Sequence, residues 1–234
     1  MLNGSGNNII HVMASKNYQK PLQNLMESLY RYSSTFKLHF VELGNAPFYD
    51  NFFDRKEKIT YKDWENRIAQ IRISSYLEFN YEEGDRVLSI DTDMVFKDDP
   101  FRVFEIFKDG DILLSTRDHQ DKIPVTACFF GFVWNDRTQS FLRHIREQAE
   151  TKLNWSTLIA FRKKRQHTGV DWWLDQDVLC AAYLDGYHNL KIRDIGWHWS
   201  YDVNHKLNRK SKEGIIKRDS AKALHYKNSK KWRN

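Results

Sequence analysis

Short runs of apolar residues alternate with stretches of helical periodicity along the first two-thirds of the chain. The apolar runs predict strands at residues 8–14, 37–43, 86–90, 110–115 and 126–134, and a later strand at 187–195. Apolar residues that recur every three or four positions predict helices at residues 18–32, 61–79, 100–108, 135–149 and 170–184. This alternation is typical of an α/β fold with a mainly parallel sheet flanked by helices.

Three segments lack a clear period. Residues 44–58 are aromatic and polar, which indicates a loop, and residues 152–168 are basic and poorly periodic, which predicts a second, mobile loop. The chain from Gly196 onward is rich in His, Trp and Lys and is interpreted as irregular. A length of 234 residues fits a single domain, and no internal repeat or linker divides it.

Composition narrows the class of ligand. The net charge is +6, and much of the excess lies in residues 206–231. A basic surface suits an anionic ligand such as a sugar nucleotide, nucleic acid or a membrane headgroup. Cys128 and Cys180 lie in apolar settings without a CxxC spacing, so we expect buried free thiols and no structural zinc. No signal peptide or membrane span is apparent, so a cytoplasmic location is expected, with peripheral membrane contact left open.

The stretch VLSIDTDMV at residues 87–95 carries the clearest chemistry. Side chains two positions apart in an extended segment point the same way, so Asp91 and Asp93 can converge at the end of a strand. Two converging carboxylates repel unless a cation lies beside them. Mg²⁺ and Mn²⁺ take oxygen ligands and share them with phosphates. The sequence therefore predicts a metal–diphosphate site at the edge of the sheet.

Two further motifs accompany this pair. Asp175, Gln176 and Asp177 lie on a predicted helix, where only one of the two acids, together with Gln176, can face a site. His225, in ALHYKNSKKW, can complete a metal shell begun by two carboxylates. Lysines that follow it, at 227, 230 or 231, can neutralise a leaving diphosphate.

In this order the motifs resemble those of GT-A fold glycosyltransferases. SIDTDMVFKDD and ACFFGFV look like the blood-group ABO-type enzymes. LDQDVL and HYKNSKKW resemble the retaining glycogenin and lipopolysaccharide galactosyltransferase group, whose last motif is approximately HxxGxxKPW. The resemblance spans residues 9–232, although Asn228 replaces the Gly and no Pro precedes Trp232. It implies one GT-A-like domain over residues 1–234, with a nucleotide-binding half at about 1–95 and an acceptor half at about 96–234.

Carried over residue by residue, the resemblance implies roles for individual side chains. Metal ligands would be Asp91, Asp93 and His225, with Mn²⁺ or Mg²⁺ as the cofactor. The donor, a nucleotide sugar with UDP favoured over a guanosine donor, would contact Ala14, Ser15, Tyr18, Arg72, Asp91, Gly131 and Lys231. On the reacting face of the donor sugar would lie Asp175 and Gln176. Retention of anomeric configuration is expected from the resemblance alone; an inverting enzyme would need a base such as Asp118, His119 or Asp171.

The acceptor, a glycan or another hydroxyl compound, is less defined, and nucleic acid is not expected. Aromatic faces pack on sugar rings, and the candidate platforms are Trp172, Trp173, Trp197, His198 and Trp199. Two segments, 152–168 and 204–217, are hypothesised to close over the donor.

Other classes fit part of the pattern. A haloacid-dehalogenase-type phosphatase would use Asp91 as nucleophile and Asp93 as acid/base, but its motif normally opens the domain. A sugar-nucleotide pyrophosphorylase would need a Gly-rich loop after the first strand, whereas Gly4 and Gly6 precede it. A carbohydrate- or nucleic-acid-binding module would use the basic, Trp-rich tail and would be indifferent to loss of Asp91.

Overall fold

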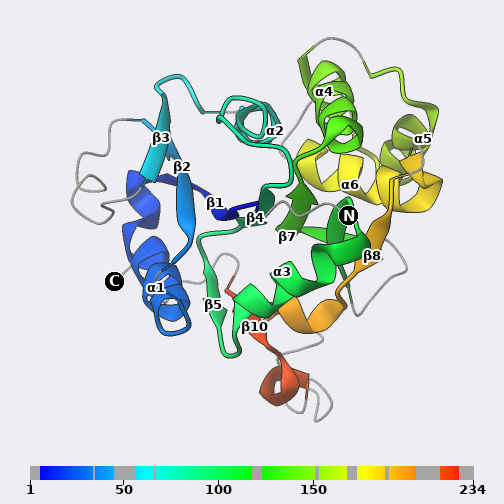
Figure 1. Cartoon of the computed structure of the whole chain (residues 1–234). Coiled ribbons are helices and arrows are strands. Elements are labelled where there is room, and N and C mark those ends of the chain that lie inside the picture. The colour runs from blue at the N-terminus through cyan, green and yellow to red at the C-terminus, as the bar shows by residue number, and fades with distance from the viewer. Residues whose placement is uncertain are drawn as a thin grey trace.

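The structure, a computed structural model, describes residues 6–33, 35–44, 56–65, 67–117, 123–150, 153–167, 173–187, 190–203 and 217–226. A seven-stranded sheet crosses its centre in the order β3-β2-β1-β4-β7-β6-β8 (Figure 1). The strands are β1 (Asn8–Ser15), β2 (Lys37–Leu43), β3 (Lys56–Tyr61), β4 (Arg86–Ile90), β6 (Ile112–Thr116), β7 (Val125–Val133) and β8 (Ile192–Asp194). The predicted α/β fold with a mainly parallel sheet is confirmed, because most neighbouring strands pair in parallel.

The exception is β7, which is antiparallel to both β4 and β6. Only residues 117–124 connect β6 to β7. A parallel crossover needs a dozen or more residues, so a connection this short forces the chain to turn back. The start of β7 therefore lies at the same edge of the sheet as the carboxyl ends of β4 and β6.

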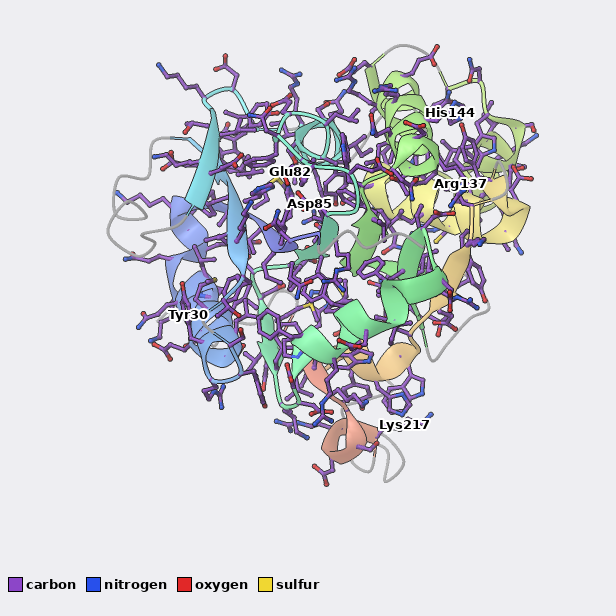
Figure 2. All side chains as sticks on the ribbon, viewed as in Figure 1. Tyr30, Glu82, Asp85, Arg137, His144 and Lys217 are labelled. Carbon is purple, nitrogen blue, oxygen red and sulfur yellow. The ribbon has the colours of Figure 1, made fainter. Side chains whose placement is uncertain are left out.

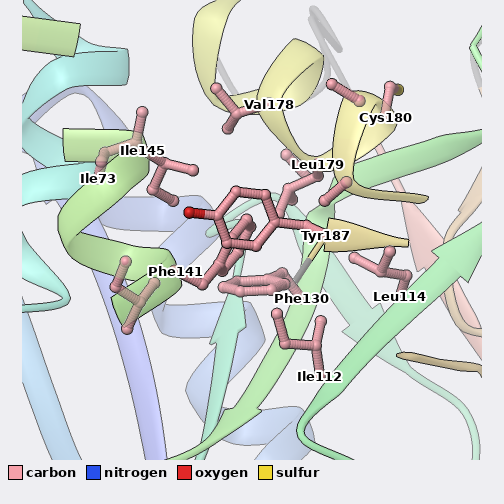
Figure 3. Close-up of a cluster of buried hydrophobic side chains, with 14 of the residues drawn as sticks. Ile73, Ile112, Leu114, Phe130, Phe141, Ile145, Val178, Leu179, Cys180 and Tyr187 are labelled. Carbon is pink, nitrogen blue, oxygen red and sulfur yellow. The ribbon is translucent and has the colours of Figure 1, made fainter. Parts of the chain in front are cut away.

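Helices cover both faces of the sheet, and successive strand residues point to opposite cores. Ile112 and Leu114 of β6 belong to the core under α2 (Ile68–Ser75), α4 (Asp136–Glu150), α5 (Ser156–Lys164) and α6 (Leu174–Asp185), part of which Figure 3 shows. Leu113, between them, belongs to the other core, under α1 (Gln19–Tyr30) and α3 (Val103–Ile106). Both faces are thus buried, which explains the continuous apolar runs.

A small second sheet carries the end of the described chain. Its order is β5-β10-β9, formed by β5 (Met94–Phe96), β10 (Ala223–His225) and β9 (Tyr201–Asp202). In this sheet β5 pairs antiparallel with β10, and His225 lies opposite Met94. The segment after Gly196 was expected to be irregular; its short strands were missed because two or three residues carry no detectable period.

Three other predictions need correction. Residues 56–61 form β3, although 44–58 was predicted to be a loop and a helix was predicted to begin at residue 61. That helix, predicted at 61–79, is confined to Ile68–Ser75. Residues 156–164 form α5, although 152–168 was predicted to be a mobile loop. The segment 100–108 contains α3 between two 3-10 turns, Pro100–Arg102 and Phe107–Asp109.

Local signals set several element ends. At the start of α4, Asn135 and Thr138 exchange backbone-to-side-chain hydrogen bonds of 3.0 and 3.1 Å, a reciprocal cap. Gly186 has φ of 62° and ends α6 in the left-handed conformation.

Polar and charged side-chain ends surround the molecule, Lys217 and Arg137 among them (Figure 2). Among the described residues, no helix combines the length and apolarity that a membrane crossing requires. Cys128 and Cys180 are buried and unpaired with each other, as expected. The central sheet runs through both predicted halves of the chain; the single-domain organisation itself stays a prediction.

Candidate active site

A cavity opens at the edge where the carboxyl ends of β1, β2, β4 and β6 meet the start of β7. Its walls come from these strand ends, from α2 and from the first turn of α6. The cavity is open to solvent, and the empty space of about 900 Å³ within it includes part of that solvent. Ligands of open α/β sheets bind at this edge.

Asp91, Asp93 and His225 converge in this cavity. Asp91 directly follows β4, and the short strands β5 and β10 bring His225 beside it, with Tyr226 N donating to Asp93 O at 2.9 Å. His225 Nε2 lies 3.1 Å from Asp93 Oδ1 and 3.6 Å from Asp91 Oδ2. The ligating atoms all lie within 4.8 Å of one another, so this donor set can hold a metal ion.

The surroundings already favour charge at this group. Burial alone would lower the pKa of His225, but Cys128 and Asp93 beside it raise that pKa well above its usual value. Burial would raise the pKa of Asp93, whereas the hydrogen bond with His225 lowers it, and the net shift is downward. The Asp93 carboxylate is therefore ionised, as a carboxylate ligand must be, whereas His225 has to release its proton when it binds a metal.

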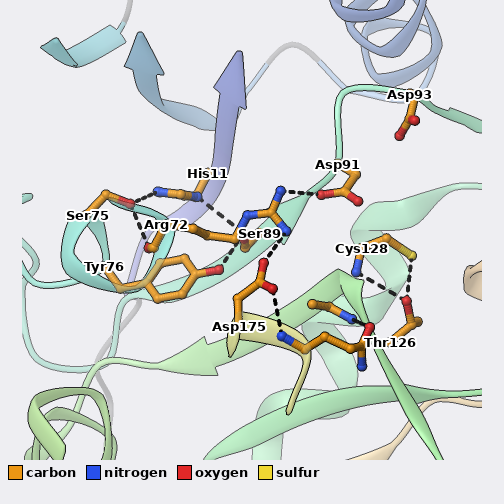
Figure 4. Close-up of polar contacts among 12 residues, drawn as sticks. His11, Arg72, Ser75, Tyr76, Ser89, Asp91, Asp93, Thr126, Cys128 and Asp175 are labelled. Carbon is orange, nitrogen blue, oxygen red and sulfur yellow. Dashed lines mark hydrogen bonds and ion pairs between the residues drawn. The ribbon is translucent and has the colours of Figure 1, made fainter. Parts of the chain in front are cut away.

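Arg72 joins the two acidic motifs (Figure 4). Its Nη2 donates to Asp91 Oδ1 at 2.6 Å and its Nη1 to Asp175 Oδ2 at 3.0 Å. Burial opposes its charge, yet Asp91 and Asp175 outweigh burial and raise the pKa of Arg72. The Arg72 side chain is only 16% exposed, so it is not an ordinary surface arginine.

A buried polar network lies behind Arg72 (Figure 4). His11 bonds Ser75 Oγ at 3.0 Å and Ser89 Oγ at 3.3 Å, and Tyr76 OH donates to Ser89 Oγ at 3.0 Å. Burial keeps the pKa of His11 well below its usual value, so this histidine is neutral. The network ties α2 to β1 and β4 and so holds the helix that carries Arg72.

The first turn of α6 separates its two acids. Asp175 faces the cavity, and its Oδ1 accepts from Gln176 N at 2.7 Å. Gln176 lines the cavity too, with Nε2 donating to Val125 O at 2.5 Å and Oε1 accepting from Ala127 N at 3.0 Å. The amide is thereby held in place by backbone.

Asp177 points away from the cavity and is 0% exposed. Its carboxylate accepts from Arg162 Nη1 at 2.6 Å, from Arg165, and pairs with His167 Nδ1 at 2.9 Å. His167 and Arg165 also lie over the ring of Trp173, at 5.8 and 5.3 Å. Trp173 lines the cavity, so this cluster, on the far side of α6, supports one wall of the site.

The donor residues expected from the sequence fall into three groups. Ala14, Ser15 and Tyr18 line the cavity at the end of β1, and the Tyr18 side chain is 40% exposed. Gly131 does not line it. Gly131 lies in the middle of β7, where an added Cβ would come within 2.7 Å of Phe107 Cζ and 2.8 Å of Leu88 Cδ2. Lys231 is outside the described residues.

The surroundings of Gly131 favour a packing role, and the binding role that the resemblance implied for it stays a prediction. Because β7 is antiparallel, it presents its first residues to the cavity. The β7 residues that line the cavity are Thr126, Ala127 and Cys128. Arg117, Trp64 and Ile68 also line the cavity and were not predicted from the sequence. For β7, the short connection at residues 117–124 was the available signal that the strand is antiparallel and begins at the site.

Of the aromatic acceptor candidates, only Trp173 lines this cavity within the described part of the chain. Trp199 is 4% exposed and stacks on Phe129 at 5.9 Å, as a core residue does. Trp197 and His198 stack on each other at 4.0 Å. Trp172 and the candidate bases at 118, 119 and 171 lie outside the described residues, as does segment 204–216 of the hypothesised lid.

Comparison by sequence finds no matching family model and no matching curated protein. Comparison of structures does. Similar folds include the glycosyltransferase GlyE of Streptococcus pneumoniae TIGR4, with a TM-score of 0.64 and 15% sequence identity. The match covers 95% of this chain and 55% of the GlyE chain. The galactosyltransferase LgtC, solved with donor and acceptor sugar analogs, gives TM-score 0.60 and 13% identity over 94% of this chain and 87% of LgtC. Mouse xyloside xylosyltransferase 1 gives a TM-score of 0.63 and 13% sequence identity, over 94% of this chain and 98% of the xylosyltransferase chain.

The chain therefore has the fold of GT-A glycosyltransferases, and the resemblance expected from its motifs is confirmed at the level of the fold. This chain spans just over half the length of GlyE and nearly all of the xylosyltransferase. The fold does not favour the phosphatase or binding-module alternatives.

Proposed function

We propose that this protein is a metal-dependent glycosyltransferase that moves a sugar from a nucleotide diphosphate sugar, UDP-linked by preference, to a hydroxyl acceptor. The observation that carries the proposal is the convergence of Asp91, Asp93 and His225 in one cavity of a GT-A fold. Two carboxylates and an imidazole suit Mn²⁺ or Mg²⁺. A cation held there supplies Lewis-acid stabilisation of a leaving diphosphate.

The order of groups along the cavity supports a division of roles. Ala14, Ser15 and Tyr18 line the cavity at and just after the end of β1 and would form the nucleoside end. The metal group follows at the end of β4, and Asp175 and Gln176 lie beyond it on α6. The donor sugar would then lie between Arg72 and Gln176, above the start of β7. Lys231 is kept as a further candidate contact of the diphosphate.

Arg72 acts as a positioning and charge-balancing group in this proposal. Its two ion pairs fix Asp91 and Asp175 at opposite ends of one guanidinium. The fork geometry of arginine makes this possible, since each nitrogen donates in a fixed direction. A carboxylate held at Asp175 favours the positive charge that develops on the sugar ring in an oxocarbenium-like transition state.

We further propose that configuration is retained. The bond from the anomeric carbon to the diphosphate oxygen breaks, the leaving oxygen keeps the electron pair, and the acceptor oxygen bonds on the same face. The acceptor proton passes to the leaving phosphate. Asp175 already accepts two hydrogen bonds, from Arg72 and from Gln176 N, which stabilise its anion and weaken it as a nucleophile. The geometry thus favours same-face attack over a covalent intermediate.

The decisive experiment measures thermal unfolding with UDP or GDP, each with and without Mn²⁺. Saturation to about 100 times Kd adds about 2.7 kcal/mol and raises Tm by roughly 5–10 °C. We expect a rise with UDP that needs Mn²⁺ and that is lost in Asp93→Ala, with each shift measured from the variant's own Tm without ligand. Asp109→Ala, on an exposed turn, is the matched control. A nucleotide shift that survives Asp93→Ala, or no shift with either nucleotide, would contradict the proposal.

A further inference from the structure

Arg117 is the cavity cation that the proposed chemistry leaves unused. It directly follows β6 and lines the cavity. Among the described residues, its one side-chain hydrogen bond runs from Nη2 to Gln176 Oε1 at 3.5 Å, the long limit of a hydrogen bond. The other cavity arginine, Arg72, is neutralised by two carboxylates.

The carboxylates of the site are paired with Arg72 and His225, and Arg117 is left without a carboxylate partner among the described residues. Asp91, Asp93 and Asp175 are engaged by Arg72 and His225. Within the part of the chain that the structure describes, no carboxylate forms an ion pair with Arg117. A guanidinium has five N–H donors, and one long bond to an amide oxygen leaves most of them free for a ligand.

The backbone holds Arg117 in a fixed place. Arg117 N donates to Pro124 O at 2.9 Å, which closes the two ends of the β6–β7 connection. Just before it, Thr116 N donates to Asp194 Oδ1 at 3.2 Å, and Ser115 Oγ donates to Gly196 O at 2.9 Å. The Asp194 carboxylate accepts Gly196 N as well, at 2.7 Å. The cation thus projects from an anchored strand end rather than from a free loop.

Strand order places Arg117 on the acceptor side. The cavity wall runs from β2 and β1, through β4, to β7 and β6. If the nucleoside lies at β1 and the diphosphate at β4, then a group on β6 lies beyond the donor sugar. Resting on the proposed function, we propose that Arg117 recognises an anionic substituent, a carboxylate or a phosphate, on the acceptor. Arginine matches both groups through paired hydrogen bonds.

The test is an acceptor panel with Mn²⁺ and a UDP-sugar that the enzyme turns over. The panel contains methyl glycosides of neutral hexoses, the corresponding uronic acids and the corresponding 6-phosphates. We expect wild type to prefer a charged member, and the uronic acid and phosphate arms tell the two sources of charge apart. A charge-assisted contact is worth about 10- to 100-fold in affinity.

Arg117→Gln is expected to lower the ratio of kcat/KM for charged over neutral acceptors by about 10- to 100-fold, chiefly through KM of the charged acceptor. Arg117→Glu is expected to reverse the preference. Arg143→Gln, on the exposed face of α4, is the matched control and keeps the wild-type ratio. The ratio is insensitive to the amount of folded enzyme, so partial misfolding cannot imitate the result.

Several outcomes would overturn the inference. They are equal use of neutral and charged acceptors by wild type, an unchanged ratio in Arg117→Gln, or a variant whose defect follows KM of the donor. Transfer to no member of the panel counts against it as well. UDP–Mn²⁺ binding, measured on the same preparations, separates failure of this inference from failure of the proposed function. If UDP–Mn²⁺ binds but charged acceptors are not preferred, only the role of Arg117 is rejected.

Discussion

Arg72 shows how one side chain can connect two motifs that lie far apart in the chain. Asp91 and Asp175 are separated by more than eighty positions, yet both accept from the same guanidinium. Each alone is an ordinary carboxylate at the end of a strand or the start of a helix. Their joint orientation depends on a planar donor at fixed distance from both, which is a property of arginine that lysine lacks.

Arg72→Lys keeps the charge and removes the bridge. We expect transferase kcat to fall by about 10- to 100-fold with a smaller change in Tm, because a single ammonium cannot donate along both directions. Arg146→Lys, a 38% exposed residue paired with Glu150 at 3.9 Å, is the control and should behave as wild type. Full activity of Arg72→Lys would show that the bridge is dispensable.

Gly131 tests the difference between packing and binding. An added methyl would come within 2.7 Å of Phe107 Cζ, 2.8 Å of Leu88 Cδ2 and 3.2 Å of Val87 O. We expect Gly131→Ala to cost about 1–3 kcal/mol in the free energy of unfolding, as overpacking does. The Kd for UDP–Mn²⁺ should stay at the wild-type value in the folded fraction. A weakened Kd without loss of stability would support the binding role expected from the sequence.

At the scale of elements, α5 and α6 form a pair held by a buried ionic cluster. Asp177 of α6 faces Arg162, which is 2% exposed, and Arg165, which is 11% exposed. The basic composition of residues 152–168 suggested a solvated loop, but two of its arginines are the partners of a carboxylate elsewhere in the chain. A local sequence window has no access to that partner, so the interpretation as a loop was wrong.

Asp177→Ala removes the carboxylate and leaves buried cations behind. Breaking a buried pair in this way costs about 3–5 kcal/mol. We expect that loss in urea unfolding, together with faster amide hydrogen exchange across α5. The exposed Asp109→Ala should show neither effect. If Asp177→Ala unfolds at the wild-type urea concentration, the cluster does not hold α5.

At the scale of the whole molecule, two buried histidines make the fold sensitive to acid. His11 of β1 and His39 of β2 are register partners, and both rings contact Phe79. Burial lowers the pKa of His39 to about 4, with Asp85 opposing and Lys37 adding to the shift, and burial lowers the pKa of His11 as well. Exposed Glu57, 3.9 Å from His39, does not reverse the effect.

The sign of the dependence follows from proton binding. In the unfolded chain both histidines titrate near pH 6.5, so between pH 6.5 and about 4 the unfolded state binds more protons than the folded state. The free energy of unfolding should therefore fall as pH drops through this window, by up to about 1.4 kcal/mol per pH unit for each histidine. Above pH 7 these groups contribute no slope.

His39→Phe separates this contribution from general acid effects. Phenylalanine fits the stacked position beside Phe79 and does not titrate, so the slope between pH 6.5 and 5 should fall by about half. His198→Phe, at a partly exposed position, is the control and should keep the wild-type slope. Urea unfolding at several pH values measures both. If the slope of the unfolding free energy against pH is unchanged in His39→Phe, then His39 is not held neutral in the folded protein.

Local patterns determined much of this protein. The alternation of strands and helices, the α/β class, the cap of α4 and the delivery of Asp91 from the end of a strand all depend on neighbours within a few residues. The extended geometry predicted for Asp91 and Asp93 was wrong, because Asp93 lies in a turn in which Met94 N donates to Asp91 O at 3.2 Å. The motif order was also sufficient to indicate a GT-A fold, which the structural comparisons confirm.

Only the tertiary structure decided how distant segments meet. The pairing of β5 with β10 puts His225 beside Asp93, the antiparallel β7 presents Thr126 to Cys128 in place of Gly131, and the rotation of α6 separates Asp175 from Asp177. Arg117 enters the site for the same reason. Each result depends on contacts between residues far apart in sequence, and such contacts leave no mark on the local hydrophobic period that a single sequence displays.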